Sequence, residues 1–208
     1  MHRAHKIKLQ PTKAQEQYFA RACGTARFAF NWALAEWQKE YEAGGKPSEA
    51  ALRKKLNSIK ATEFPWMAEV TKCAPQQAIK NVGTAFQNFF RRVKQGGKPG
   101  YPKFKRKGQH DSFRADNGPA DANSHAVECI GKTIKLPRCG AVKMREALRF
   151  TGRTLSATVS KQADGWYVTL LVDTADIMSG PLGGGTVGVD LGLKNLAVLS
   201  TGEVLPPL

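Results

Sequence analysis

The alternation of polar and apolar residues at the amino terminus predicts a short strand followed by helices. The stretch His5–Gln10 (HKIKLQ) alternates in the way a half-buried strand does, and a proline ends it. Thr12 and Gln15 then form a capping-box pattern, which predicts the start of a helix. Helical periodicity continues to about Ala43, and we expect Gly24 to divide this region into two helices.

Two further helices are expected before the pattern changes. One begins at Ser48 and places Leu52, Leu56 and Ile59 on one face. The other follows Pro75, a residue that is tolerated in the first helical turn. Its apolar residues recur at helical spacing and are expected to lie in the core: Ala78, Val82, Ala85, Phe86, Phe89, Phe90 and Val93.

The second half of the chain has the pattern of short strands. The segment Gln95–Gly108 (QGGKPGYPKFKRKG) is too rich in glycine and proline to be an ordinary helix. Four apolar or alternating runs come later: TIKLP, GAVKM, TLSATVS and GWYVTLLVD. The last two flank Asp164 and Gly165, a pair that favours a hairpin turn. Two more strand-like runs, Val187–Leu191 and Leu196–Ser200, are joined by a tight turn.

This order of elements predicts an α+β protein in which helices interrupt one β-domain. The first strand needs partners, and the strands of the second half can supply them. The expected organisation is a first strand at 1–10, a helical insert with a basic loop at 11–110, the rest of the β-domain at 111–177, a glycine-rich linker at 178–185 and the start of a new sheet at 186–208.

The charge of the chain indicates a polyanionic partner. Among 208 residues, 32 are Lys or Arg and 17 are Asp or Glu, which gives a formal net charge of +15. Nucleic acid is the first candidate, and a merely soluble basic protein is the alternative. A membrane partner is not expected, because the chain has no apolar stretch near the ~18 residues of a spanning helix and no signal or lipidation motif.

The four cysteines do not have the spacing of a metal site. None forms a CxxC pair, and the histidines show no ligand spacing, so we expect no zinc site in this chain. Without a secretory signal, the thiols are expected to be reduced in the cytoplasm. Cys23 lies in an apolar helical stretch and is expected to be core.

One long segment carries positive charge without any acid. Between Val70 and His110 there are ten cations and no Asp or Glu: Lys72, Lys80, Arg91, Arg92, Lys94, Lys98, Lys103, Lys105, Arg106 and Lys107. Phe89, Phe90, Tyr101 and Phe104 are interleaved with them. This combination is typical of a surface that binds a phosphate backbone and stacks bases. A solvated basic loop over a core is the alternative, and the pattern does not separate DNA from RNA.

A single carboxylate near the end of the chain suggests metal chemistry. In GVDLGLKNLAVLSTGE (Gly188–Glu203), an apolar strand delivers Asp190 into a glycine turn, a position suited to a Mg²⁺ ligand. Two-metal phosphodiester cleavage needs several carboxylates, and Glu203 is the only later acid. Asp190 as an ordinary turn residue is the alternative. Sugar-kinase, actin and heat-shock-type ATPases open a sheet similarly but with threonines, so RNase H-like nucleases fit better.

Four segments in order resemble the TnpB family of RNA-guided nucleases from insertion sequences. The first is KIKLQPTKAQEQYFARACGTARFAFNWAL, with the pattern Gly24, Arg27, Phe28 and Asn31. The second is AIKNVGTAFQNFFRRVKQGGKPGYPKFKRK, and the third is IKLPRCGAVKM. The fourth is GVDLGLKNLAVLSTGE, which resembles the first RuvC motif of the family. Any one of these would be weak, but four in the family's order are specific.

The resemblance implies a fold and a set of partners. The fold is an OB-like, wedge-type β-barrel split by a helical recognition insert, followed by the first hairpin of an RNase H-like (RuvC) domain. The partners are a guide RNA and double-stranded target DNA with a short adjacent motif. Lys72, Gln76 and Asn81 are candidates for reading that motif, with capping or packing as the alternative for Gln76. The other candidates for nucleic-acid contact are Arg91, Arg92, Tyr101, Lys103, Lys105 and Arg106.

The chain also departs from the family. Asp190 matches the first catalytic acid and metal ligand, but the second Glu, the third Asp and the zinc ribbon have no counterpart. We therefore expect no cleavage by this chain alone, and Mg²⁺ binding only in a complete RuvC site. The favoured expectation is a piece of a longer enzyme, cytoplasmic and nucleoid-associated. The alternatives are a short relative that binds without cutting, an active endonuclease whose RuvC domain is completed by another chain, and an ATPase-type domain.

Overall fold

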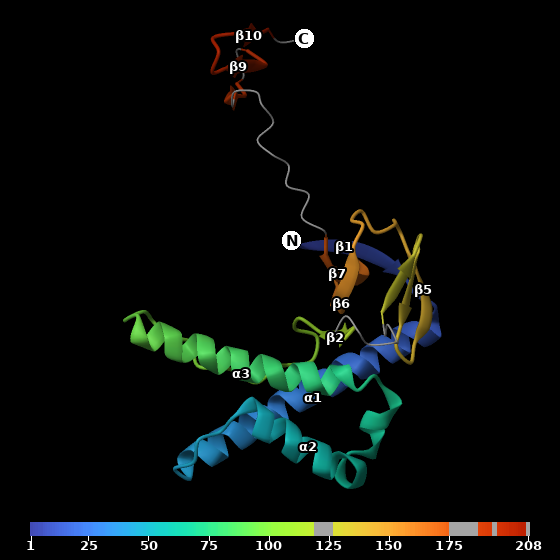
Figure 1. Ribbon diagram of the computed structural model, residues 1–208, viewed down its shortest axis with the longest axis vertical. Helices are drawn as coiled ribbons and strands as arrows, with labels where there is room; N and C mark the ends of the chain where they lie inside the picture. The colour runs from blue at the N-terminus through green and yellow to red at the C-terminus, as the bar shows by residue number, and fades with distance from the viewer. Residues whose placement is uncertain (119–126, 175–186, 193–194, 207–208) are drawn as a thin grey trace. The chain divides into compact units, whose positions relative to one another are not determined.

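The computed structural model describes residues 1–118, 127–174, 187–192 and 195–206. The chain divides into two compact units, Met1–Ala175 and Asp176–Leu208. The first unit combines three long helices with a sheet, and the second carries only short strands (Figure 1). The protein is therefore α+β, as the sequence predicts.

The described part of the first unit contains a seven-stranded sheet in which every pairing is antiparallel. The spatial order is β2-β6-β7-β1-β5-β4-β3. The strands are β1 (His2–Gln10), β2 (Ser112–Asp116), β3 (Glu128–Ile130), β4 (Thr133–Leu136), β5 (Gly140–Met144), β6 (Arg153–Gln162) and β7 (Gly165–Asp173).

Strand β1 joins the two parts of this sheet. Its residues His2 to Lys8 pair with β7, and Leu9 and Gln10 pair with β5. The expectation that later strands supply the partners of the first strand is confirmed. The inward face of β1 is His5, Ile7 and Leu9, so the alternation in the sequence is also confirmed. All the helices among the described residues of this unit lie between β1 and β2 along the chain.

The helices are α1 (Lys13–Glu42), α2 (Glu49–Glu63), the short 3-10 helix η1 (Pro65–Glu69) and α3 (Cys73–Lys94). Thr12 and Gln15 form the expected capping box, and Ser48 caps α2. The expected break at Gly24 is wrong, because α1 runs through it. A glycine costs a helix only about 1 kcal/mol, and the burial of α1 against the rest of the unit outweighs that cost.

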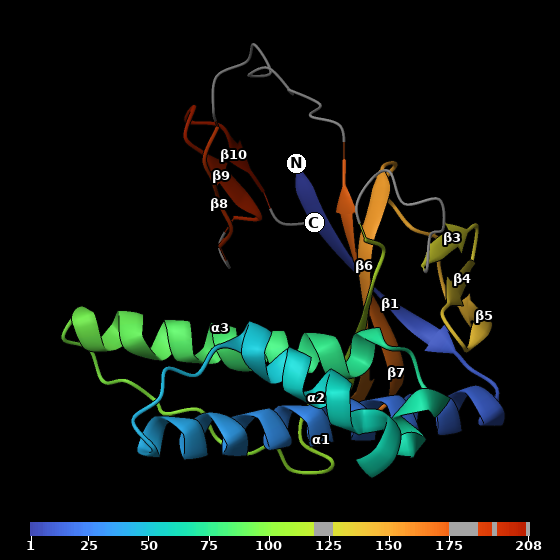
Figure 2. The same cartoon turned by 60° about the horizontal axis from the view of Figure 1, so that its bottom comes forward.

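Helix α1 packs against α3 and β2, and the three long helices lie together on one side of the sheet (Figure 2). Phe19 and Cys23 are buried in this core, as expected for Cys23. The core prediction for α3 is right for Ala78, Val82 and Phe86 but wrong for Phe90 and Val93. The latter two are 43% and 48% exposed. Helical periodicity identifies the apolar face of a helix, but it does not show how much of that face another element covers.

The four strand-like runs of the second half correspond to β4, β5, β6 and β7. The hairpin between β6 and β7 is confirmed, but its turn residues are Ala163 and Asp164, one position earlier than expected, since Gly165 already pairs with Gln162. The sequence pattern missed β2 and β3. In β2, only Phe113 and Ala115 are buried, which gives a weak apolar signal.

The second unit contains three short strands within its described residues, in the antiparallel order β10-β9-β8. Strands β8 (Val189–Asp190) and β9 (Ala197–Leu199) fall in the two runs expected, while β10 (Val204–Leu205) was not expected. The segment 178–185, expected to be a linker, lies outside the described residues. Most large apolar side chains here are well exposed: Val187, Val189, Leu191, Leu196, Val198, Val204 and Leu205.

Candidate nucleic-acid interface

The ten cations of the acid-free segment belong to the end of the connection between η1 and α3, to α3 itself and to the loop that follows it. All ten residues are exposed. None makes an ion pair with any described residue, whereas Arg27, Lys55 and Arg114 elsewhere in the unit do. A surface kept only for solubility would mix the two signs of charge. The segment therefore presents positive charge that the described protein does not compensate.

Arg91, Arg92 and Lys94 occupy the last turn of α3. Cations are favoured at this position because the carbonyl groups at a helix carboxyl terminus carry partial negative charge. The helix thus stabilises three adjacent cations at its exposed end. The roles of Arg91 and Arg92 in contacting RNA or heteroduplex stay predictions.

The basic loop after α3 is held against α1 by two side chains, Arg27 and Asn31. Arg27 Nη1 donates to Asp111 Oδ1 at 2.7 Å, and both side chains are largely buried. Asn31 makes two bonds with the main chain of Lys105: Nδ2 donates to its carbonyl oxygen at 3.0 Å, and Oδ1 accepts from its amide at 2.8 Å. Because Arg27 and Asn31 are four residues apart, they lie on one face of α1. They fix the return path of the loop along that helix (Figure 2).

Replacing Asn31 by alanine is expected to release the loop from α1. Two hydrogen bonds to the Lys105 main chain are lost, which should lower the free energy of unfolding by about 1–2 kcal/mol. Hydrogen exchange at the Lys105 amide should accelerate, while exchange at the core of α1 stays unchanged. Asn57→Ala is the matched control, because Asn57 is exposed and its amide oxygen accepts only from Lys60 Nζ. Unchanged protection of Lys105 in Asn31→Ala would contradict this role.

The candidate cations of the loop differ in their surroundings. The Lys105 ammonium lies 4.5 Å from the centre of the Phe30 ring. Burial on this side lowers the pKa of Lys105, although the residue as a whole is exposed. Lys103 and Arg106 are exposed and make no side-chain hydrogen bond to a described residue. Lys103 and Arg106 are therefore better placed than Lys105 to contact phosphate. The Lys105 ammonium instead makes a cation–π contact with Phe30.

Tyr101 combines a packed edge with an exposed side. Its ring meets Phe86 at 5.5 Å and Phe89 at 5.4 Å between centroids, both edge-on, and Phe86 stacks on Trp37 at 4.3 Å. Tyr101 is still 44% exposed, and Phe104 nearby in the loop is 53% exposed. The structure therefore places exposed aromatic rings among the unpaired cations, the combination that stacked bases and phosphates require.

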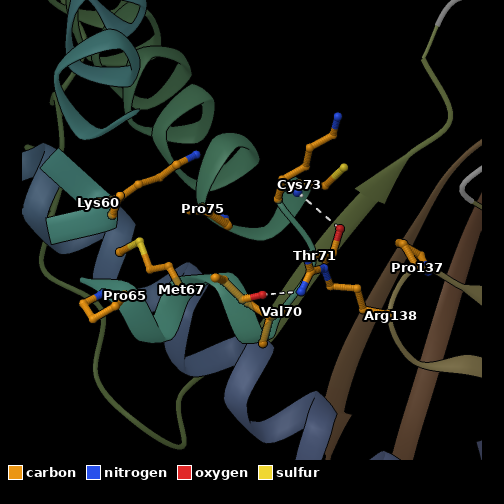
Figure 3. Close-up of a pocket in the computed structure, with 12 residues that line it drawn as sticks. Lys60, Pro65, Met67, Val70, Thr71, Cys73, Pro75, Pro137 and Arg138 are labelled. Atoms are coloured by element: carbon orange, nitrogen blue, oxygen red, sulfur yellow. Dashed lines mark hydrogen bonds between the residues drawn. The ribbon is translucent and has the colours of Figure 1, made fainter. Parts of the chain in front are cut away.

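A cavity of about 560 Å³ lies beside the first turn of α3 (Figure 3). Residues of α2, η1 and the start of α3 line one side, and Pro137 and Arg138 from the β4–β5 turn line the other. Lys72 lines this cavity with two further cations, Lys60 and Arg138. Its walls are otherwise mainly apolar, so the three cations set its charge.

Tyr18 on α1 connects the two sides of this cavity. Its hydroxyl donates to the carbonyl oxygen of Pro137 at 2.8 Å and accepts from the amide of Thr71 at 3.2 Å. Burial raises the pKa of Tyr18 to about 12, so the phenol stays protonated and able to donate. Arg138 adopts a positive φ of 62° and donates to the carbonyl oxygen of Ala68. Hydrogen bonds therefore connect the β4–β5 turn with the segment before α3 and with η1, on the two sides of the cavity.

The other two candidates for reading a DNA motif lie outside the cavity lining. Gln76 is half-buried and its side chain makes no hydrogen bond to a described residue, while the side chain of the neighbouring Gln77 donates to Asp116 on β2. Asn81 is exposed on the following turn of α3. The structure thus places Lys72 with other cations but does not bring Gln76 and Asn81 to that cavity.

Asp190 lies in the second unit, on the edge strand β8, and is exposed. It pairs with Val198, which also pairs with Val204 on its other side, so these three side chains share a face. Glu203 directly precedes Val204 and lies outside strand β10. No group of three or more ligating side chains is found among the described residues. The catalytic and metal-binding roles of Asp190 stay predictions.

Sequence reasoning missed several residues that shape these sites. Arg138 and Lys60 are far from Lys72 along the chain, and no local pattern connects them. Arg27 and Asn31 do have a signal, because they belong to the family pattern with Gly24 and Phe28, but that pattern does not identify the loop as their partner. No helix in the described part of the chain is long and apolar enough to cross a membrane.

Comparison with known proteins gives consistent matches. A family model described as a helix-turn-helix domain (HTH_OrfB_IS605) matches residues 1–46. In this structure, that segment contains β1 and the unbroken helix α1.

Three relatives, all provisionally named RNA-guided DNA endonucleases, match nearly the whole chain. InsQ of Escherichia coli K12 is 32% identical over 99% of this chain and 49% of its own length. A protein of Streptomyces pristinaespiralis is 28% identical over 97% of this chain and 48% of its own. Rv2885c of Mycobacterium tuberculosis is 29% identical over 96% of this chain and 48% of its own. The chain spans about half the length of these relatives, and the matches support its assignment to the TnpB family.

Proposed function

We propose that this chain is the RNA-guided DNA-binding portion of a TnpB-like, transposon-associated nuclease. The observation that carries the proposal is the segment of ten exposed cations, acid-free and without an ion pair to any described residue. Such a surface matches the charge of a phosphate backbone. A guide RNA and target double-stranded DNA are the partners, as the names of the relatives suggest.

We assign the interrupted sheet to the OB-like wedge barrel of the family and the helices to its recognition insert. The pairing of β1 with both β7 and β5 supports this assignment, because it makes the helical segment an insertion within one sheet. The C-terminal end of α3 and the basic loop would contact guide RNA or heteroduplex. The start of α3, with Lys72 beside the cavity, would contact the DNA motif, together with Gln76 and Asn81.

We assign the second unit to the first hairpin of a RuvC domain. Its exposed apolar strands support this, because a small sheet with little buried surface needs further structure to cover it. Asp190 would be one Mg²⁺ ligand there. A single exposed carboxylate does not fit a two-metal site, so we expect cleavage only when more sequence or another chain supplies further carboxylates.

The test is a binding assay with the full chain. Structured RNA that co-purifies with the protein should be recovered and labelled, and its binding measured between about 50 and 200 mM salt. Contact with six or more phosphates predicts a loss of about a thousandfold in affinity over that range. Pure protein with no RNA and no affinity for one would refute the proposal.

The alternative of an active endonuclease is tested separately. The chain should be incubated with Mg²⁺, guide RNA and target duplex, alone and with any chain that completes the RuvC domain. Cleavage that is lost in Asp190→Ala would support an active enzyme. No cleavage by the intact assembly would exclude it and leave the binding function.

A further inference from the structure

A second groove, of about 510 Å³, lies on a face of α1 and has a different lining from the cavity beside Lys72. It is lined by Gly24, Arg27, Phe28, Asn31, Trp32 and Trp66. The first five residues have the spacing of one helix face, and Trp66 reaches it from η1. Three of the six are aromatic, and among these described residues none is acidic.

The aromatic walls are held in place by packing. Phe28 meets Trp66 edge-on at 5.2 Å and Phe64 at 4.9 Å between ring centroids. Trp66 is nevertheless 40% exposed, although tryptophan side chains are on average highly buried. The groove therefore offers a fixed, partly open aromatic surface, which can stack against another flat ring.

Gly24 forms part of the floor, and its small size has no explanation inside the protein. It lies within α1, where an alanine would make the helix more stable. An added Cβ would meet only the Arg27 guanidinium, at 3.9 Å. Gly83 differs, because a Cβ there would come within 2.9 Å of Glu49, so that glycine lets α2 and α3 approach. Gly24 instead keeps space open in the groove.

The charge around the groove indicates its occupant. Asn31, which lines it, binds the Lys105 main chain, and Arg27 binds Asp111 at the end of the same loop. The acid-free cationic loop is thus fastened to the edge of an aromatic groove. Aromatic walls suit a base, and cations at the edge suit the adjoining phosphates.

We propose that the groove binds an unstacked nucleobase of a single-stranded nucleic acid, between the aromatic side chains and over Gly24. This inference rests on the proposed nucleic-acid-binding function and specifies one site within it. Recognition by stacking is tolerant of base identity, because every base has a π-face. Arg27 and Asn31 position the loop, through Arg27 Nη1 on Asp111 and the Asn31 amide on the Lys105 main chain.

The test compares Gly24→Ala and Gly24→Leu with the unchanged chain. Three fluorescein-labelled strands of equal length are the probes: oligouridylate, oligodeoxythymidylate and an abasic deoxyribose strand. The expected results are a melting temperature at or above that of the unchanged chain and a loss of affinity of about tenfold for base-bearing strands in Gly24→Leu. Binding of the abasic strand should change little, and Gly24→Ala should be intermediate. Quenching of tryptophan fluorescence by the bases should weaken in parallel.

Ala14→Leu is the matched control, because it places the same leucine side chain at an exposed position of α1, ten residues from Gly24 and outside the groove. The proposal is overturned if Gly24→Leu binds base-bearing strands as tightly as the control does. It is also overturned if Gly24→Leu instead abolishes self-association, which would make the occupant a second copy of the chain. If the unchanged chain binds no nucleic acid at all, the proposed function fails as well. The uridylate and thymidylate arms distinguish RNA from DNA as the source of the base.

Discussion

Replacing six cations of the acid-free segment by glutamine is expected to lower the affinity for structured RNA about a hundredfold or more at 100–150 mM salt. The six are Arg91, Arg92, Lys94, Lys98, Lys103 and Arg106, all exposed and without an ion pair to a described residue. Each phosphate contact releases a condensed counterion, and this release supplies much of the binding free energy. Lys105 is left unchanged, because its ammonium contacts Phe30 and its main chain anchors the loop.

The salt dependence gives the sharper measurement. If all six contact phosphates, the slope of log affinity against log salt should become shallower by about four to five. The matched control removes the same charge elsewhere, at exposed lysines of the first unit: Lys13, Lys46, Lys54, Lys132, Lys135 and Lys143. An equal loss in the control would mean that net charge, and not this surface, determines binding.

The parts of the fold that the sequence predicts correctly depend on residues close together in the chain. The capping box joins Thr12 and Gln15 through neighbouring backbone groups. The hairpin between β6 and β7 needs only a tight turn between two apolar runs, and it forms within one residue of the expected position. Predictions of this kind hold because the groups that interact are already neighbours in the sequence.

The parts that the sequence did not predict depend on contacts between distant residues. Glycine has a low helix propensity, but Gly24 does not interrupt α1, because the packing of α1 against the rest of the unit outweighs that cost. Asn31 holds the loop at Lys105, 74 residues further along the chain, and Arg138 bonds the main chain of Ala68, 70 residues earlier. Nothing in the sequence around either residue identifies its partner. The ten cations were evident from the sequence, but their lack of ion pairs required the structure, because a distant acid could have neutralised any of them.

Helix α1 therefore has two roles that can be separated by mutation, since it anchors the basic loop on one face and the core on the other. Phe19 belongs to the core face and is fully buried. Its ring centroid lies 5.2 Å from that of Trp166 on β7 and 6.0 Å from that of Phe113 on β2. Phe19 thus packs the helical insert against two strands of the sheet, β7 and β2.

Replacing Phe19 by alanine is expected to lower the free energy of unfolding by about 3–5 kcal/mol, because it removes a buried ring and leaves a cavity. Since many domains are stable by only about 5–15 kcal/mol, this loss should be visible in urea denaturation followed by circular dichroism. Phe104→Ala is the control: that ring is 53% exposed, and its removal should cost about 0.5 kcal/mol or less. If the helices depend on the sheet, the helical circular dichroism signal and the hydrogen-exchange protection of the β6 and β7 amides should be lost in one shared transition. Separate transitions, with Phe19→Ala affecting only one, would mean that the insert and the sheet fold independently.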